Sequence, residues 1–192
     1  MANPTIYQPL LQKLATVEAL SEAEKDSIVA LCRDVHGVPR NRNIITEGAN
    51  PDRVHIILSG WAARYNELRD GSRRITAFLL PGDFCDIQTT TLVAMDHSIL
   101  AVTDCEVAFV APALIEEITA SSAVLTRAFW RSTLIDEAIL RQWLVNTGRR
   151  NSKDRLACLL CELHARMNLV GLVSDGHMKL PLTQEFMADA LG

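Results

Sequence analysis

Residues 54–60 read Val-His-Ile-Ile-Leu-Ser-Gly, residues 68–71 read Leu-Arg-Asp-Gly, and residues 78–84 read Phe-Leu-Leu-Pro-Gly-Asp-Phe. These stretches place glycine turns between short apolar runs, and an Asp-Gly pair between two extended stretches is a strong hairpin signal. Several short strands at close spacing, from about residue 36 to 110, predict an antiparallel barrel or roll. Glycine adopts the positive φ that such turns and corners need. The glycines concerned are Gly48, Gly60, Gly71 and Gly82.

Helices are predicted on both sides of this β-rich segment. Before it, residues 8–35 carry apolar residues at helical spacing, and Ser21 is a plausible N-cap with acids in the turn that follows. After it, Pro112 fits a first helical position. Residues 121–147 contain no glycine or proline, which allows one long helix. The sequence therefore predicts an α+β fold, with a jelly-roll-like, double-stranded antiparallel β-roll flanked by helices.

An apolar stripe runs along the predicted long helix. A helix of this length spans roughly 40 Å, which is more than a small roll needs for support. A second copy of the same helix is a natural cover for such a stripe, so we expect dimerisation here. Packing within the same chain remains the alternative. The stripe consists of Leu125, Ala128, Ile135, Ile139 and Trp143.

Beyond the long helix the chain predicts a smaller helical unit. Gly148 is expected to interrupt the helix, and Asn151 with Ser152 to cap the next one. A turn at residues 175–176 joins two short extended stretches. Thr183 is then an N-cap for a last helix over residues 184–191, with Gly192 as its C-cap or turn residue.

Composition gives few constraints on function. The chain has 192 residues, 48% of them apolar, and a net charge of −4. It has no apolar run near the ~20 residues of a membrane span and no secretion signal at its start, so we expect a cytoplasmic protein. The cysteines are odd in number and scattered, which argues against a disulfide framework. They are Cys32, Cys85, Cys105, Cys158 and Cys161.

A local basic cluster is more informative than the whole-chain charge. Residues 141–155 hold five cations against a single acid, Asp154. A solvated helix end and a nucleic-acid contact are both compatible with such a cluster. The five cations are Arg141, Arg149, Arg150, Lys153 and Arg155.

The order of these elements and of their glycines resembles the Crp/Fnr family of bacterial transcription regulators. The stretches quoted above, together with Ile45-Thr-Glu-Gly-Ala49 and Asp104-Cys-Glu-Val107, look like the cyclic-nucleotide-binding β-roll. The long helix, the Asp154-Arg-Leu-Ala157 helix, the hairpin and residues 182–192 look like the dimer helix and the start of a winged helix-turn-helix. The resemblance covers almost the whole chain.

The resemblance implies an organisation and a function. It implies a sensor domain over residues 1–120, a dimerisation helix over 121–148 and an incomplete winged helix-turn-helix over 149–192. It further implies a homodimer that binds DNA, acts with RNA polymerase and responds to a small effector of unknown identity. We expect the recognition helix to begin just past Gly192. The alternative is a stand-alone β-roll that binds a ligand or dimerises without a direct DNA role.

The effector implied by the resemblance is not cyclic AMP. At the family positions that bind the nucleotide, the glycine is replaced by Asp86, the ribose-binding acid by Ile87 and the phosphate-binding arginine by His97, and only Ser98 is retained. An anion needs backbone donors and a guanidinium fork, which these side chains do not supply. Cyclic nucleotide binding stays a third, weaker hypothesis. The candidate effector pocket comprises Gly82, Asp83, Phe84, Cys85, Asp86, Ile87, His97, Ser98, Leu140 and Arg141.

The resemblance also suggests contacts with the DNA backbone. If residues 183–191 form the first helix of a helix-turn-helix, that helix crosses the DNA backbone and the next one reads the bases. The base-reading residues then lie beyond residue 192. The candidate phosphate contacts are Arg149, Arg150, Lys153, Thr183 and Gln184.

Neither a metal, a cofactor nor catalysis is expected. The first 31 residues contain no cysteine, which argues against an iron–sulfur centre. Cys158 and Cys161 form a C-x-x-C pair, but a zinc site needs two more ligands and only His164 is near. The acids beside Cys85 disfavour a reactive thiolate there. No phosphate loop, H-E-x-x-H or G-x-S-x-G motif is present.

Overall fold

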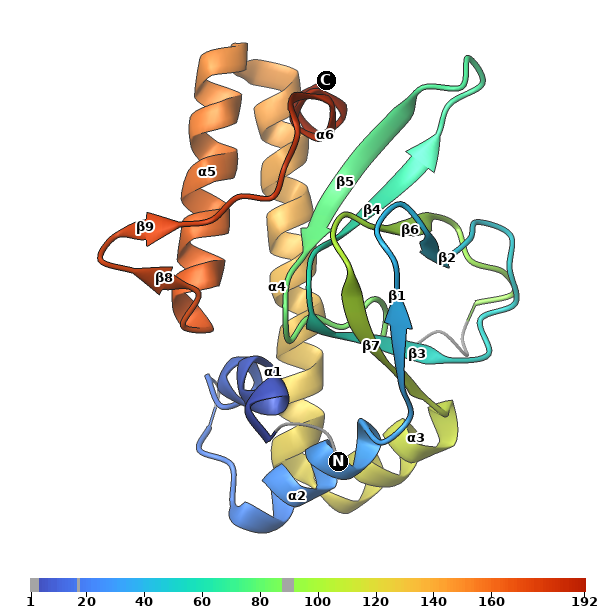
Figure 1. The fold of residues 1–192 in the computed structure, drawn as a ribbon. Helices are drawn as coiled ribbons and strands as arrows, with labels where there is room; N and C mark the ends of the chain where they lie inside the picture. Colours follow the sequence, from blue (N-terminus) through green and yellow to red (C-terminus); the bar gives the residue numbers. More distant parts are fainter. Residues whose placement is uncertain (1–3, 17, 88–91) are drawn as a thin grey trace.

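A long helix, α4 (Ala123–Arg149), forms the spine of the molecule. The structure is a computed structural model that describes residues 4–16, 18–87 and 92–192. Figure 1 shows two β-sheets on one side of α4, with α5 (Ser152–Leu169) running alongside it and the N-terminal helices gathered at one end. The predicted α+β class, with a β-roll flanked by helices, is confirmed. In the described part of the chain, no helix has the length and apolarity to cross a membrane.

The N-terminal region holds a short 3-10 helix and two α-helices. They are η1 (Pro4–Tyr7), α1 (Gln8–Leu14) and α2 (Glu22–Leu31). The predicted cap is confirmed, because the Ser21 hydroxyl accepts from the Glu24 N–H at 3.3 Å and the Glu24 carboxylate accepts from the Ser21 N–H at 2.8 Å. The helical prediction for residues 8–35 runs too far, since strand β1 already begins at Val35.

The roll consists of two antiparallel sheets. One has the strand order β1-β7-β3 and the other β2-β6-β4-β5. The strands are β1 (Val35–Val38), β2 (Asn43–Ile45), β3 (Val54–Ser59), β4 (Ala62–Glu67), β5 (Arg73–Leu79), β6 (Ser98–Ala101) and β7 (Cys105–Val110). The four glycines expected at turns and corners all have positive φ, between 81° and 85°.

Several strands are buried on both faces, which explains their nearly continuous apolar sequence. In β3, Val54, Ile56 and Leu58 pack with the N-terminal helices and α4, whereas Ile57 points into the roll. In β5, Phe78 packs outward with the C-terminal helices and Leu79 points inward. The N-terminal helices therefore pack on the outer side of β3, and the C-terminal helices pack on the outer side of β5.

The helices after the roll follow the predictions with one correction. α3 (Pro112–Ser121) begins at the expected proline, and the Ser122 hydroxyl caps α4 by accepting from the Leu125 N–H at 3.1 Å. The prediction that Gly148 interrupts the long helix is wrong, because α4 continues through it to Arg149. One exposed glycine in the last turn costs only about 1 kcal/mol, which a long packed helix tolerates.

The C-terminal unit packs on the roll. It comprises α5, the hairpin strands β8 (Val173–Ser174) and β9 (His177–Met178), and α6 (Gln184–Leu191). The predicted caps Asn151 and Thr183 are confirmed. Phe186 of α6 joins a core cluster with Phe78 of β5 and Leu163 of α5. The Arg73 guanidinium in β5 also pairs with Glu185 of α6 at 3.0 Å.

Candidate ligand-binding site

A cavity of about 640 Å³ lies between the roll and α4. Its floor comes from β4, β5 and the segments around residues 84–87 and 96–97, and its outer wall comes from the middle of α4. This volume is in the range of small-molecule sites, which are concave and mostly apolar with a few polar groups. The lining residues are Arg64, Asn66, Thr76, Phe84, Cys85, Asp86, Ile87, Leu92, Asp96, His97, Trp130, Thr133, Leu134, Asp136, Glu137 and Leu140.

The structure brings only part of the expected effector pocket to this cavity. Phe84, Cys85, Asp86, Ile87, His97 and Leu140 line it. Gly82, Asp83, Ser98 and Arg141 do not line it, and their part in an effector pocket stays a prediction. The Ser98 hydroxyl accepts from the Glu47 N–H at 2.9 Å inside the roll, and Asp83 turns toward the helices on the other side of its segment. The Arg141 guanidinium pairs along the helix with Glu137 at 2.9 Å.

Arg64 of β4 is the cation of the cavity, and its guanidinium already has partners in the protein. Nη2 donates to the Cys85 carbonyl at 2.5 Å and lies 3.6 Å from Asp86 Oδ1. Sequence reasoning missed this residue, because it is far in sequence from the Pro-Gly-Asp-Phe corner. The available signal was a single arginine in the otherwise apolar start of β4, whose neighbours Ala62 and Ala63 are buried.

His97 lies between two carboxylates. Its Nε2 atom is 3.1 Å from Asp86 Oδ2, and its Nδ1 atom is 2.7 Å from Asp96 Oδ1. The hydrogen bond from His97 holds the pKa of Asp96 below its ordinary range. The position that resembles the family's phosphate-binding arginine is therefore surrounded by negative charge. Carboxylates on both sides disfavour an anion at this position. The expectation that cyclic AMP is not the ligand stays a prediction.

Asp136 of α4 is a second residue that sequence reasoning missed. Burial, with a smaller repulsion from Asp83, raises the pKa of its carboxyl to about 6, although Arg64, Arg166 and Lys13 act in the opposite direction. Among the described residues, none forms a hydrogen bond or ion pair with this carboxyl group. Strongly perturbed carboxyl groups that line a cavity are candidates for a functional role.

The Asp136→Asn variant is expected to be more stable than the wild type well above pH 6, by about 3 kcal/mol. In the folded protein the carboxyl keeps its proton up to about pH 6, whereas in the unfolded chain it ionises near pH 4. The free energy of unfolding of the wild type therefore falls as the pH rises between these two values, and it stays lower at higher pH. Urea unfolding at pH 4.5 and pH 7.5 measures the difference. Glu137→Gln is the control, since Glu137 pairs with an exposed arginine; an equal gain at both pH values would contradict the assignment.

The predicted dimer stripe on α4 faces the protein's own core. Leu125, Ala128 and Trp143 are at most 8% exposed, so the prediction that they pair with a second chain is wrong. They pack against the N-terminal helices or the C-terminal unit. Ile139 is partly buried in the same way, and Ile135 is 42% exposed. The intramolecular alternative is the correct one for most of this stripe.

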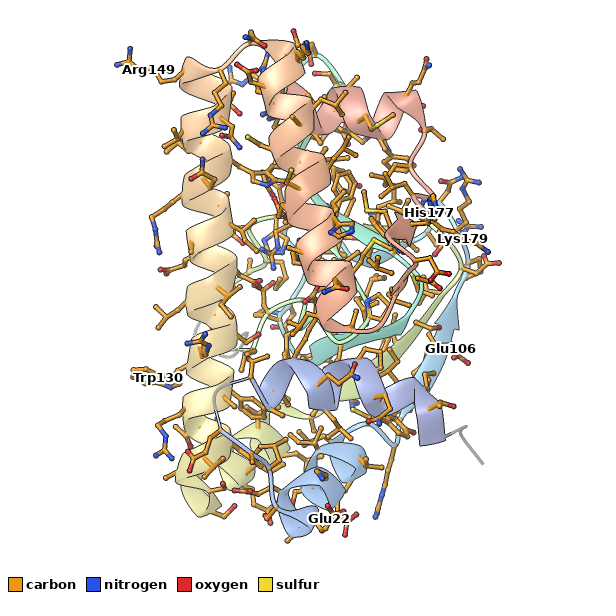
Figure 2. The ribbon with its side chains drawn as sticks, turned by 90° about the vertical axis from the view of Figure 1, so that its left-hand side faces the viewer. Glu22, Glu106, Trp130, Arg149, His177 and Lys179 are labelled. Atoms are coloured by element: carbon orange, nitrogen blue, oxygen red, sulfur yellow. The ribbon has the colours of Figure 1, made fainter. Side chains whose placement is uncertain are left out.

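A different set of apolar side chains is exposed on the opposite side of α4. Figure 2 shows Trp130 projecting away from the body of the molecule. At 3.6 residues per turn, Trp130 and Ile139 point in nearly opposite directions. We call this set the outer stripe; it consists of Trp130, Leu134, Leu144 and Val145, with exposed fractions of 64%, 56%, 75% and 51%.

The basic residues lie at the end of the molecule where α4 meets α5. Arg149 projects from the last turn of α4 (Figure 2), and Arg150 and Lys153 are also exposed. The Arg155 guanidinium donates to the Leu191 carbonyl at 2.6 Å, which holds the end of α6 beside the start of α5. The Thr183 hydroxyl caps α6 and Gln184 is exposed.

The cysteines and metal-ligating side chains form no second site in the described residues. Burial, reinforced by Asp86, raises the pKa of the Cys85 thiol well above its usual range, which makes the thiol a poor nucleophile. Across residues 4–16, 18–87 and 92–192, no group of three histidine, cysteine or acidic side chains is placed to hold a metal ion. Cys158 lies against the Arg150 guanidinium, and Cys161 is exposed on α5.

Comparison with known proteins shows what this arrangement is similar to. The family model described as the cyclic nucleotide-binding domain matches residues 35–122. The transcriptional activator protein FnrL of Cereibacter sphaeroides is 30% identical over 154 residues, which cover 79% of this chain and 61% of FnrL. The nitrogen fixation regulation protein FixK of Azorhizobium caulinodans is 24% identical over 176 residues, covering 92% of this chain and 70% of FixK. The chain thus spans less than two thirds of the length of FnrL.

Solved structures agree on the fold. The structure of FixK2 from Bradyrhizobium japonicum superimposes with a TM-score of 0.72 and 24% identity, over 82% of this chain and 76% of that one. The c-di-GMP-responsive global regulator CLP of Xanthomonas campestris gives a TM-score of 0.71 at 11% identity, over 89% of this chain and 84% of that one. The glycine corners, the roll and the helices that follow it therefore give the chain the fold of these regulators, and its sequence is similar to regulators of the Crp/Fnr type.

Proposed function

We propose that the complete protein is a DNA-binding transcription regulator that acts as a homodimer in the cytoplasm, together with RNA polymerase. The observation that carries this proposal is the order of elements after the roll. The long helix α4 leads to α5, a short hairpin and the capped helix α6, and relatives matched over 79% and 92% of this chain are named as regulators. These matches favour the regulator over a stand-alone β-roll module.

Within this proposal the chain divides into the three parts expected from the sequence. Residues 1–120 form the sensor, 121–148 the dimerisation helix and 149–192 part of a winged helix-turn-helix. The outer stripe replaces the originally expected contact surface on α4. Four apolar side chains that are exposed along one helix favour burial against another surface. The same stripe on α4 of a second copy offers apolar side chains at the same spacing.

The cavity is the proposed effector site. Its walls carry more acids than bases, and its only arginine, among the described residues, is already bonded to the protein. We expect a small molecule other than a cyclic nucleotide to bind here. Micromolar binding of cyclic AMP or cyclic GMP in a calorimetric titration would contradict this part of the proposal.

Neutralising Arg149, Arg150 and Lys153 together is expected to weaken DNA binding about equally for all sequences. Each lost phosphate contact lowers the slope of log K against log salt by about 1, so the triple glutamine variant should lose about 3. The measurement is fluorescence anisotropy of the complete gene product with duplex DNA over a range of salt concentrations.

A cation at the far end of α4 provides the control. Arg127→Gln removes one positive charge from the same helix. Arg127 pairs with Glu18 near the N-terminal helices, so this substitution should leave the slope unchanged, whereas each of the three cations should contribute about 1 to it. An unaltered slope in the triple variant would contradict the phosphate contacts. Failure of the complete gene product to bind DNA at low salt would contradict the DNA-binding role itself.

A further inference from the structure

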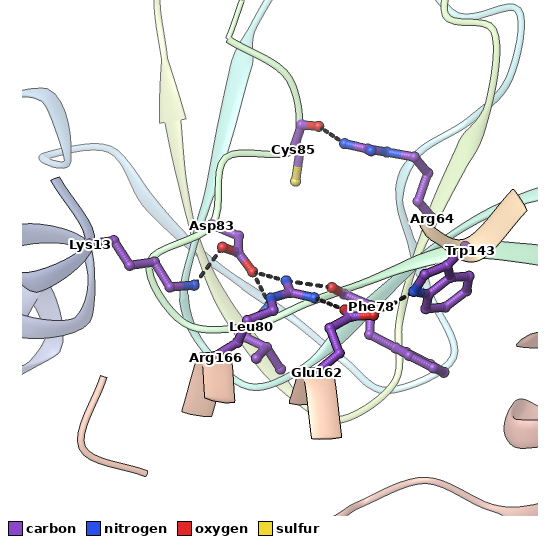
Figure 3. A network of polar contacts seen from close by, with 9 residues as sticks. All are labelled: Lys13, Arg64, Phe78, Leu80, Asp83, Cys85, Trp143, Glu162 and Arg166. Carbon is purple, nitrogen blue, oxygen red and sulfur yellow. Dashed lines mark hydrogen bonds and ion pairs between the residues drawn. The ribbon is translucent and has the colours of Figure 1, made fainter. Parts of the chain in front are cut away.

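Asp83 is the centre of a buried ionic network at the corner of the roll (Figure 3). Its Oδ1 atom accepts from Lys13 Nζ of α1 at 2.5 Å. Its Oδ2 atom accepts from the Leu80 N–H at 2.6 Å and from Arg166 Nη2 of α5 at 2.8 Å. One carboxylate thus connects the N-terminal helix, the roll and the C-terminal unit.

Arg166 extends the network into the helices. Its Nη2 atom also donates to the Phe78 carbonyl of β5 at 2.8 Å, and its Nη1 atom donates to Glu162 of α5 at 2.8 Å. The other oxygen of Glu162 accepts from Trp143 Nε1 of α4 at 2.5 Å. The Asp83 and Arg166 side chains are 11% and 14% exposed, so water screens this contact weakly.

The charges in the network depend on one another. Burial opposes the ionisation of Asp83, but Lys13 and Arg166 outweigh it and hold the pKa of Asp83 below its ordinary range. Removing one partner of a buried charged pair leaves the other uncompensated, which is strongly unfavourable. The carboxylate is therefore required as long as both cations are buried beside it.

The network can break at one contact and still leave Asp83 and Arg166 each with a partner of opposite charge. On the roll side, Asp83 keeps Lys13 and the Leu80 N–H. On the helix side, Arg166 keeps Glu162, four residues away on the same helix. Only the two bonds of Arg166 Nη2, to Asp83 and to the Phe78 carbonyl, cross between the two sides. Two arrangements that are each internally paired are what a switching element requires.

The same short segment also forms a wall of the cavity. Phe84, Cys85 and Asp86 follow Asp83 directly and line the cavity, where Arg64 holds the Cys85 carbonyl. Figure 3 shows the Arg64 contact and the Arg166 contact on the two sides of this segment. A displacement of the segment at the cavity therefore moves the carboxylate that holds α5.

We propose that the Asp83–Arg166 contact is a latch that holds the C-terminal unit, α5 to α6, on the roll. Opening the latch loosens the attachment of this unit, which then rests on the core cluster around Phe78 and Phe186 and on the Arg73 ion pair with Glu185, while the roll itself stays intact. The latch is a property of this chain alone and does not require that the protein binds DNA. Its test is therefore independent of the function proposed above.

Hydrogen–deuterium exchange of the 192-residue chain tests the latch. In Asp83→Asn, the protection of amides in α6 and in the last turns of α5 is expected to fall about tenfold or more, because the substitution removes the charge that pairs with Arg166. Amides of α1 should lose protection as well, since Lys13 loses the same partner. Amides of β3, β6 and β7 should keep their protection. Arg141→Gln is the control, because it breaks an ion pair with Glu137 that lies wholly on the exposed face of α4.

Two further variants separate a latch from a merely stabilising contact. Arg166→Lys keeps a cation near Asp83 but loses the forked guanidinium that also donates to the Phe78 carbonyl. The protection of amides in α6 should therefore lie between that of the wild type and that of Asp83→Asn. Asp83→Asn combined with Arg166→Gln should lose less protection than the sum of the two single effects, because the two substitutions share the Asp83–Arg166 contact. Equal loss throughout the roll and the C-terminal unit, unchanged exchange in α5 and α6, or additive effects of the two substitutions would each overturn the proposal.

Discussion

Leu144→Glu is expected to break the proposed dimer and leave a monomer at micromolar concentration. Leu144 is 75% exposed within one chain, the largest exposed fraction in the outer stripe. In a two-fold interface the same residue appears twice, so the substitution buries two carboxylates without partners. We expect the dimer dissociation constant to rise about 100-fold or more, since an unpaired buried charge costs several kcal/mol.

A second position on the same helix provides a matched control. Gln142 is also exposed, but it lies away from the outer stripe, and Gln142→Glu introduces the same carboxylate with little change in shape. Sedimentation equilibrium of the wild type and both variants gives the dissociation constants. A monomeric wild type would contradict the dimer, and equal effects of the two substitutions would contradict the outer stripe as its interface.

Gly82→Ala is expected to lower the free energy of unfolding by about 3 kcal/mol. Gly82 has φ of 85°, a conformation that costs an L-residue about 1–2 kcal/mol. A Cβ atom there would also lie 2.7 Å from backbone atoms of Pro9 and Leu10 in α1. Backbone cannot rotate away as a side chain can, so α1 has to shift, at a further cost of about 1–3 kcal/mol typical of overpacking.

Gly71 separates the two contributions. Its φ is 81°, nearly the same as that of Gly82, but a Cβ atom there has no neighbour within 4 Å. Gly71→Ala should therefore cost only the conformational part, about 1–2 kcal/mol. Urea unfolding of both variants measures the difference. Equal losses would show that the contact between the roll corner and α1 contributes nothing to stability.

Local chemistry explains the parts of the fold that sequence predicted well. The caps Ser21, Asn151 and Thr183 act within three residues of themselves, and glycine corners need only a positive φ. Such features are set by neighbouring residues and are independent of what packs on them. The strand runs, the long helix and the family resemblance all rest on features of this kind.

The errors concern features that depend on distant parts of the chain. α4 is apolar on two sides, and periodicity alone does not say whether the chain's own core or a second copy covers a given side. The stripe through Leu125 and Trp143 is covered by the chain itself, which leaves Trp130 and Leu144 outside. Arg64 was missed for a related reason, because only the folded roll brings its side chain to the Cys85 carbonyl across 21 positions of sequence.

Sequence by itself determined the turns, the caps, the order of elements and the absence of the family's nucleotide-binding side chains. Tertiary structure alone decided where neighbouring residues point. Asp83 and Asp86 are three positions apart, yet one holds α5 through Arg166 and the other lines the cavity. The physical reason is that burial, charge pairing and register are properties of groups brought together by folding, which adjacency in a chain does not specify.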